Sequence, residues 1–89
     1  MDKEYTVAEI KIGEWVVSVI ETIDQHKGEV MEREFICTSY DMRETSHSLI
    51  EAVEFAKSVT GLTALNSWVY VAILAKQAHE FYRERGFIA

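Results

Sequence analysis

Residues 5–23 read YTVAEIKIGEWVVSVIETI, a stretch in which apolar and polar side chains alternate on both sides of Gly13. This period of two is typical of strands with one buried face, and glycine readily adopts the positive φ of a tight turn. A turn at Gly13-Glu14 would place three opposed apolar pairs on one face: Ile12 with Trp15, Ile10 with Val17, and Ala8 with Val19. The opposite face would carry Glu9, Lys11 and Ser18, with Val7, Val16 and Ile20 among them. The stretch therefore predicts a β-hairpin.

A second chain reversal is expected at residues 24–28, after which the alternation continues to about Tyr40. The third strand would oppose the second in pairs that suit its pattern: Val19 with Phe35, Val17 with Cys37, Ile23 with Met31, and the oppositely charged Glu21 with Arg33. The alternative is one helix over residues 6–24. Because β-branched residues between Trp15 and Ile20 would lose side-chain freedom in a helix, we favour strands. The prediction is a three-stranded antiparallel meander over about residues 5–12, 15–23 and 30–39.

From about Asp41 onward, apolar residues recur at spacings of three and four, which is typical of helices packed by one face. Asp41 followed by Glu44 matches an N-terminal capping box, so the first helix is expected over about residues 42–60. Gly61 suits the left-handed residue that ends a helix. Thr63 or Asn66 can cap a second helix over about residues 64–85.

The connection between the helices is short, which favours antiparallel packing. The expected fold class is therefore α+β, with a three-stranded meander followed by two antiparallel helices packed on one face. The 89 residues are expected to form a single domain, residues 1–89.

The last helix is expected to be apolar over a wide arc, about twice the width that covers one core. Trp68, Val71, Leu74 and Phe81 lie in that arc. The excess apolar surface is buried either within the chain or between two chains. We favour a homodimer, because two helices on three strands leave little protein to cover both sides of the last helix. A homodimer assembled through these four residues is therefore one alternative for the protein's role.

The acidic residues are concentrated in the first half of the chain. Residues 1–44 hold 5 Lys and Arg against 11 Asp and Glu, residues 45–89 hold 4 of each, and the net charge is −6. Such a field repels phosphates and attracts basic protein surfaces, so nucleic-acid binding is disfavoured. Glu9, Glu29, Glu32 and Glu34 are the candidate partner-binding residues. A plainer interpretation is that the acid keeps a small protein soluble.

Residues with catalytic or metal-binding potential are few and scattered. The sequence has no phosphate-binding glycine loop and no motif of serine hydrolases or zinc peptidases. His47, Glu51 and Glu54 would share a helix face but are too few for a zinc site. Cys37 would need His47 or His79 as a base, and we expect it on the apolar face, where a thiol is inert. His79, on the apolar side of the last helix, is a candidate pH sensor.

The expected function follows from the lack of catalytic and metal-binding motifs and from the acidic net charge. Residues 1–4 lack the basic start of a signal peptide, and the 14 uncharged residues 62–75 fall short of the about 20 that a membrane span needs. We expect a cytoplasmic protein without membrane contact, enzymatic activity, cofactor or metal. The leading hypothesis is a small acidic interaction module, of a regulatory, inhibitory or immunity type, that binds a basic protein surface. A small metal- or thiol-dependent enzyme using Cys37, His47 or His79 is the third hypothesis.

Overall fold

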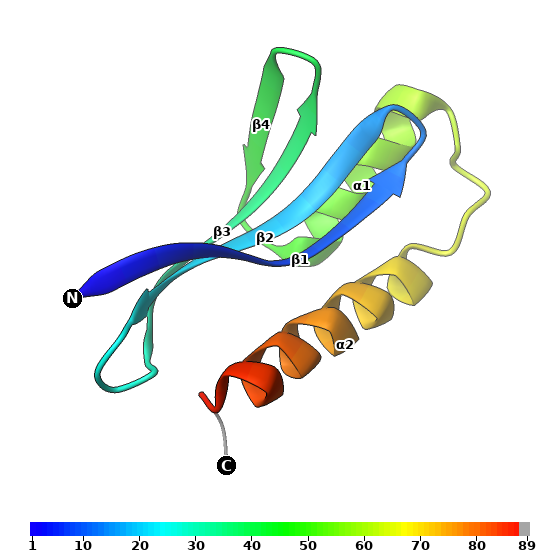
Figure 1. Cartoon of the computed structure of the whole chain (residues 1–89). Coiled ribbons are helices and arrows are strands. Elements are labelled where there is room, and N and C mark those ends of the chain that lie inside the picture. Colours follow the sequence, from blue (N-terminus) through cyan, green and yellow to red (C-terminus); the bar gives the residue numbers. More distant parts are fainter. Residues whose placement is uncertain (88–89) are drawn as a thin grey trace.

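The computed structural model describes residues 1–87 as a four-stranded antiparallel sheet followed by two helices (Figure 1). The strands are β1 (Asp2–Ile12), β2 (Trp15–Asp24), β3 (Val30–Ser39) and β4 (Met42–Ser46), and they lie side by side in sequence order. The helices α1 (Leu49–Thr60) and α2 (Ser67–Arg85) pack on one face of the twisted sheet and run in broadly opposite directions. The α+β class is confirmed, with one strand more than predicted.

The hairpin of β1 and β2 has the predicted register. Its apolar pairs are Ile12 with Trp15, Ile10 with Val17, and Ala8 with Val19. Gly13 in the turn has a φ of 63°, and a Cβ added there would come within 2.7 Å of Thr60 Cγ2 at the end of α1. Glycine therefore serves both the turn and the close approach of the hairpin to α1.

Two irregularities interrupt the otherwise predicted strand register. Between Thr6 and Ala8 the extra residue is Val7, which is buried near α2 and not, as expected, on the opposite face. A second irregularity places Ile23 opposite Val30 instead of Met31. Because a bulge adds a residue to one strand only, the strict alternation of inward and outward side chains fails there.

The start predicted for the first helix is wrong, because residues 42–46 form strand β4. Tyr40 has a left-handed φ of 53° in the turn, after which Met42 pairs with Ser39. Asp41 and Glu44 match a capping box in spacing. The backbone groups of this segment are paired in the sheet instead, which satisfies them equally well.

The true capping box lies at the start of α1. Ser48 is the N-cap, and its side chain accepts a hydrogen bond from the backbone N–H of Glu51. The Glu51 carboxylate in turn accepts from the N–H of His47. This reciprocal arrangement satisfies N–H groups that the first helical turn leaves unpaired. Gly61, with a φ of 74°, ends the helix as predicted.

α2 begins at Ser67, slightly later than expected, after Asn66, one of the two predicted caps. It lies along β1, where the side-chain carbonyl of Gln77 accepts a hydrogen bond from the backbone N–H of Glu9. The buried Lys57 Nζ donates to Ser67 Oγ at 2.6 Å and joins the end of α1 to the start of α2. No helix among residues 1–87 is long and apolar enough to cross a membrane.

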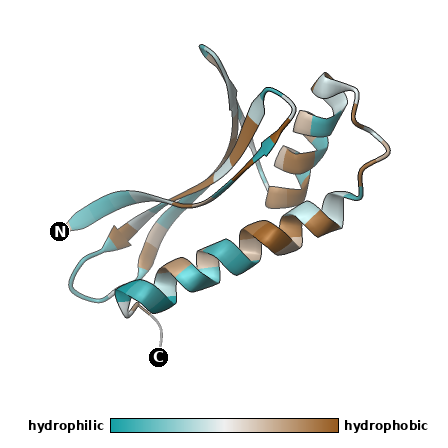
Figure 2. Cartoon of the chain, turned by 45° about the vertical axis from the view of Figure 1, so that its right-hand side comes forward, coloured by the Kyte–Doolittle hydropathy of each residue, from teal (hydrophilic) through white to brown (hydrophobic). Residues whose placement is uncertain are grey.

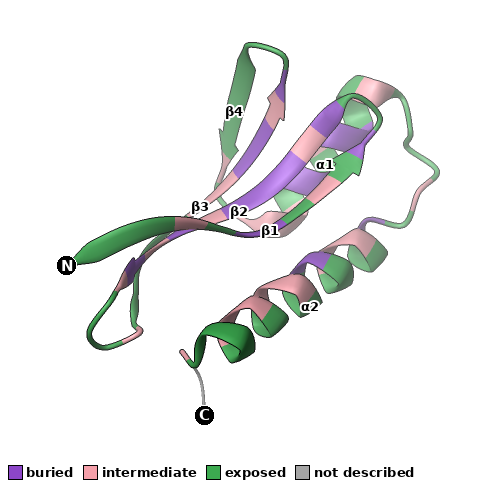
Figure 3. Cartoon of the chain, in the orientation of Figure 1, coloured by how far each residue is buried: buried purple, intermediate pink, exposed green. Residues whose placement is uncertain are grey.

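The core lies between the helices and the face of the sheet that they cover. β2 contributes most to it, whereas β4 and the outward side of α2 are exposed (Figure 3). Edge-to-face aromatic pairs close its two ends, Trp15 with Phe55 and Tyr5 with Phe81, each with ring centroids 5.3 Å apart. The central side chains have no exposed surface: Val17, Cys37, Val53, Ala56 and Leu74.

Two valines of α1 provide a direct test of this core. Val53 is completely buried and Val59 is 47% exposed. Val53→Ala should lower the free energy of unfolding by about 2 kcal/mol, since it removes two buried carbons and leaves a cavity. Val59→Ala should change it by less than about 0.5 kcal/mol. Urea denaturation followed by circular dichroism measures both, and equal effects would contradict the described packing.

Candidate binding surfaces and an inner cleft

The sheet has an inner face, covered by the helices, and an outer face, which no described element covers. Because Val17 and Val19 of β2 point into the core, the alternate residues of that strand point outward. These outward residues are Val16, Ser18, Ile20 and Thr22. Residues directly opposite them in neighbouring strands share the same face.

Acidic residues of β1 and β3 flank this outward row. The opposed pairs are Glu9 with Ser18, Glu34 with Ile20, and both Glu4 and Glu32 with Thr22. We call Glu4, Glu9, Glu32 and Glu34 the outer acidic group. Three of the four predicted partner-binding residues belong to it, and Glu4 is a member that was not predicted.

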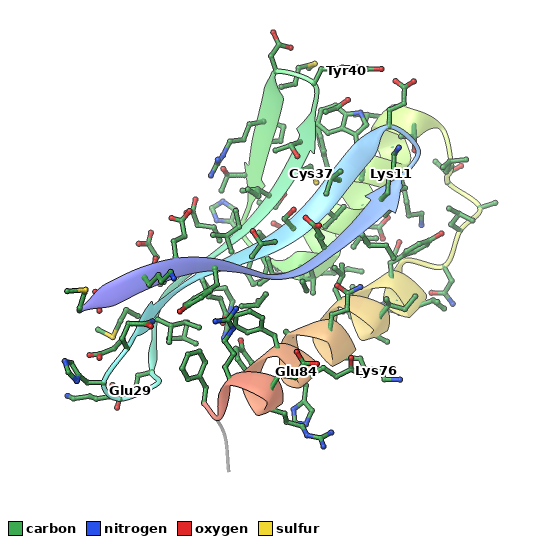
Figure 4. The ribbon with its side chains drawn as sticks, in the orientation of Figure 1. Lys11, Glu29, Cys37, Tyr40, Lys76 and Glu84 are labelled. Carbon is green, nitrogen blue, oxygen red and sulfur yellow. The ribbon has the colours of Figure 1, made fainter. Side chains whose placement is uncertain are left out.

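The charges of the outer face are separated along its length. Lys11 and Arg43 lie in the row of Val16, toward the hairpin turn, and Arg43 Nη2 is 3.5 Å from Glu34 Oε2. Glu29, the fourth predicted residue, is exposed in the loop between β2 and β3, at the opposite end of the molecule from Lys11 (Figure 4). Glu29 thus continues the acidic end of the face into this loop, which also carries Lys27.

The inner face carries one fully buried charged side chain, Glu21, which is 1% exposed. Arg33 Nε lies 2.5 Å from Glu21 Oε2, in the cross-strand pair predicted from the sequence. The hydroxyl of Tyr82, from α2, donates to the same carboxylate. These bonds join β2, β3 and α2, and they compensate much of the cost of burying the charge.

A cleft of about 240 Å³ opens beside this trio, between the sheet, the start of α1 and the middle of α2. Glu21, Arg33 and Tyr82 form its polar end. The rest of its lining is apolar and comes from the sheet and from both helices: Val19, Phe35, Leu49, Leu74, Ala75 and Ala78. An apolar hollow with a few convergent polar groups is the usual form of a small-molecule site.

The environment shifts the pKa of two groups at the polar end. Burial, together with the neighbouring Glu21 carboxylate, raises the pKa of Tyr82 to about 12, so the phenol stays protonated and donates to Glu21. The hydrogen bond to Glu21 raises the pKa of Arg33 above its ordinary value. Over the whole neutral range the Tyr82 phenol therefore stays protonated and Arg33 stays positively charged.

Cys37 and the histidines are not assembled into a reactive centre. Cys37 is buried opposite Val17, as predicted, and its Sγ donates to the carbonyl of Ala52 at 3.0 Å. Burial raises the pKa of this thiol to about 11, which suppresses the reactive thiolate. His47 and His79 are exposed, so His79 is not enclosed in the apolar surroundings expected for it. Within residues 1–87, no three His, Cys, Asp or Glu side chains cluster as a metal site.

The four residues expected in a self-association surface separate into two sets. Leu74 is fully buried in the core of the chain, and Val71 and Phe81 are partly buried against it. Trp68 is 65% exposed, next to Val69. The wide apolar arc of α2 is therefore divided, with most of it covered by the sheet and a stripe in its first half left uncovered.

Comparisons of the chain with protein-family models, with curated proteins and with solved structures found no match.

The raised pKa values predict how stability depends on pH. In the unfolded chain Cys37 and Tyr82 lose their protons near their ordinary pKa values of 9.0 and 10.0, but in the folded chain they do so only near about 11 and about 12. Between those values the unfolded state binds fewer protons, so the free energy of unfolding should fall as the pH rises. Tyr82→Phe should flatten the fall above about pH 10, while lowering stability at neutral pH by about 1–2 kcal/mol.

The matched control is Tyr40→Phe, because Tyr40 is 88% exposed and points away from the protein (Figure 4). It should leave the pH profile unchanged. Denaturant unfolding at a series of pH values measures all three proteins. The assignment of the effect to Tyr82 fails if the Tyr82→Phe profile falls as steeply as that of the unaltered chain.

Proposed function

We propose that the protein is a small acidic, non-enzymatic interaction module that binds a basic protein surface through the outer face of its sheet. The proposal is carried by one observation. Among residues 1–87, the uncovered sheet face presents four carboxylates, Glu4, Glu9, Glu32 and Glu34, against two basic side chains, Lys11 and Arg43, of which Arg43 lies beside Glu34. A regulatory, inhibitory or immunity-type role suits a module of this kind.

The chemistry of the outer face suits a protein partner. Ile20 and Val16 are half-buried on either side of the buried pair Ser18 and Ile36, and the carboxylates stand around the Ile20 end of this row. Protein interfaces commonly combine an apolar centre with a charged rim. The carboxylates would steer a basic surface toward the face and set its orientation, while the centre is desolvated on contact.

Charge reversal tests this surface. Changing Glu4, Glu9, Glu32 and Glu34 to Lys should reduce capture of a basic partner from the source cells by at least about tenfold, because each reversal replaces attraction with repulsion. The matched control reverses four exposed acids away from the outer face, Glu14, Glu44, Glu80 and Glu84. Both variants change the net charge from −6 by the same amount.

The measurement is quantitative affinity capture, with circular dichroism to verify that each variant is folded. A partner retained by the control and lost by the outer-face variant supports the proposal. If both variants lose the partner equally, the loss is an effect of overall charge. If both retain it equally, the outer face does not bind the partner.

Self-association through α2 is the second candidate, and the exposed stripe in the first half of that helix favours it. The four-residue spacing places Trp68 beside Ala72 and Val69 beside Ile73, all exposed. Figure 2 shows the hydrophobic residues of α2 concentrated in this half, with hydrophilic ones toward the C-terminal end. Tryptophan at the centre of such a patch is a common interface anchor.

Trp68→Glu tests the homodimer. A dimer should be observed by sedimentation equilibrium for the unaltered chain at micromolar concentration, and the charge should weaken its association by at least about tenfold. Val59→Glu, on α1, is the matched control, since Val59 is also exposed but lies off the stripe. A monomeric mass for the unaltered chain would exclude this candidate and leave the outer-face proposal intact.

A further inference from the structure

One residue of the inner face has a charge that stability alone does not require. The inward residues of β2 are otherwise apolar: Trp15, Val17, Val19 and Ile23. Glu21 interrupts this series, and it is held by Arg33 and Tyr82. A carboxylate buried in an apolar series is costly, and an apolar residue of similar size is often as stable, so a charged pair at the edge of a cleft points to a role in binding.

The orientation of Arg33 leaves part of its guanidinium available. Its Nε donates to Glu21, and the guanidinium also lies close to the Tyr82 hydroxyl, which leaves part of its terminal N–H groups toward the cleft. The side chain is 47% exposed, at the polar end of the cleft. The bond to Glu21 fixes the guanidinium, and the terminal N–H groups match the two oxygens of a carboxylate.

The other two polar groups select against a cationic ligand. Both oxygens of Glu21 already accept hydrogen bonds, from Arg33 and from Tyr82, and the Tyr82 hydroxyl uses its proton in that bond. The donors that remain at this end of the cleft belong to Arg33. A ligand head group must therefore be a hydrogen-bond acceptor, and an anion is the strongest acceptor for a guanidinium.

The apolar part of the cleft sets the size of the ligand. Its volume of about 240 Å³ lies below the roughly 300–1,000 Å³ of sites for drug-sized molecules. Ala75 and Ala78 form the α2 wall, and their small side chains keep the hollow open. Phe35 and Leu49 offer flat and branched apolar surface on the other sides. A short aromatic or aliphatic body fits this lining.

We propose that this cleft binds a small monocarboxylate with an apolar body, an aryl- or alkyl-carboxylate, with Arg33 as the anchor of its carboxylate. The body lies among Val19, Phe35, Leu74 and the two alanines of α2. The site is on the inner face and is independent of the protein partner proposed for the outer face.

Phenylpropionate is a suitable probe, and phenylpropanol is its neutral counterpart with nearly the same body. Titration of the full chain is followed by amide chemical shifts in NMR, at about 150 mM salt so that the net charge of the protein is screened. Phenylpropionate should bind with a dissociation constant of about 1 mM, the affinity of a ligand with few atoms. Phenylpropanol should bind at least about tenfold more weakly, because it cannot form the paired bond to Arg33.

Ala75→Leu is the blocking variant, because Ala75 lines the cleft at an exposed position where a larger side chain is compatible with folding. It should weaken phenylpropionate binding by at least about tenfold. Ala72→Leu, exposed on the same helix but outside the cleft, should change the dissociation constant by less than about twofold. Comparison of these two variants distinguishes ligand binding in the cleft from a general effect of a larger side chain on α2.

Three results would overturn the proposal. They are no chemical-shift change up to about 20 mM phenylpropionate, equal affinity for the alcohol, or unchanged affinity in Ala75→Leu. None of these results depends on the outer-face variants. Ligand binding in the cleft and partner binding by the outer face are therefore tested independently.

Discussion

Both helices are organised around the inward side of β2. Its apolar side chains, from Trp15 to Ile23, face α1 at one end and α2 at the other, and the two helices are themselves joined by the bond from Lys57 to Ser67. At Glu21 the same strand provides the carboxylate that ties β3 and α2 to it through Arg33 and Tyr82. In so small a chain, β2 matters because it places four apolar side chains in the core, Trp15, Val17, Val19 and Ile23, between the contributions of β1 and α1.

Because the side chains of β2 alternate between the two faces, the acidic outer face and the inner cleft are separated only by the thickness of the sheet. Outward residues such as Ile20 lie among carboxylates that face solvent, whereas inward residues such as Val19 border a cleft with an arginine at its polar end. The bulge at Val7 contributes to this division, because it turns an apolar residue from the outer face toward α2. A partner on one face and a small molecule on the other would therefore not compete for the same atoms.

The sequence predicted features that depend on neighbours along the chain or on regular pairing. The hairpin register, the cap at Gly61 and the burial of Cys37 belong to this class. It did not predict β4, because Asp41 and Glu44 have the spacing of a helix start and only pairing with β3 distinguishes the two states. The contact of Tyr82 with Glu21 joins residues 61 positions apart, and no local pattern signals it. The pairing of Glu21 with Arg33 was predictable, but its place in a cleft was not.

The two edges of the sheet are closed to further strands in different ways. On β1, α2 takes up the N–H of Glu9 through Gln77, and the beginning of the strand carries three charges in succession, Asp2, Lys3 and Glu4. β4 at the other edge is only five residues long and includes the charged pair Arg43-Glu44. Short or charged borders discourage the sheet-to-sheet addition from which fibrils grow. These borders therefore disfavour fibril growth in a chain that is rich in β-branched residues.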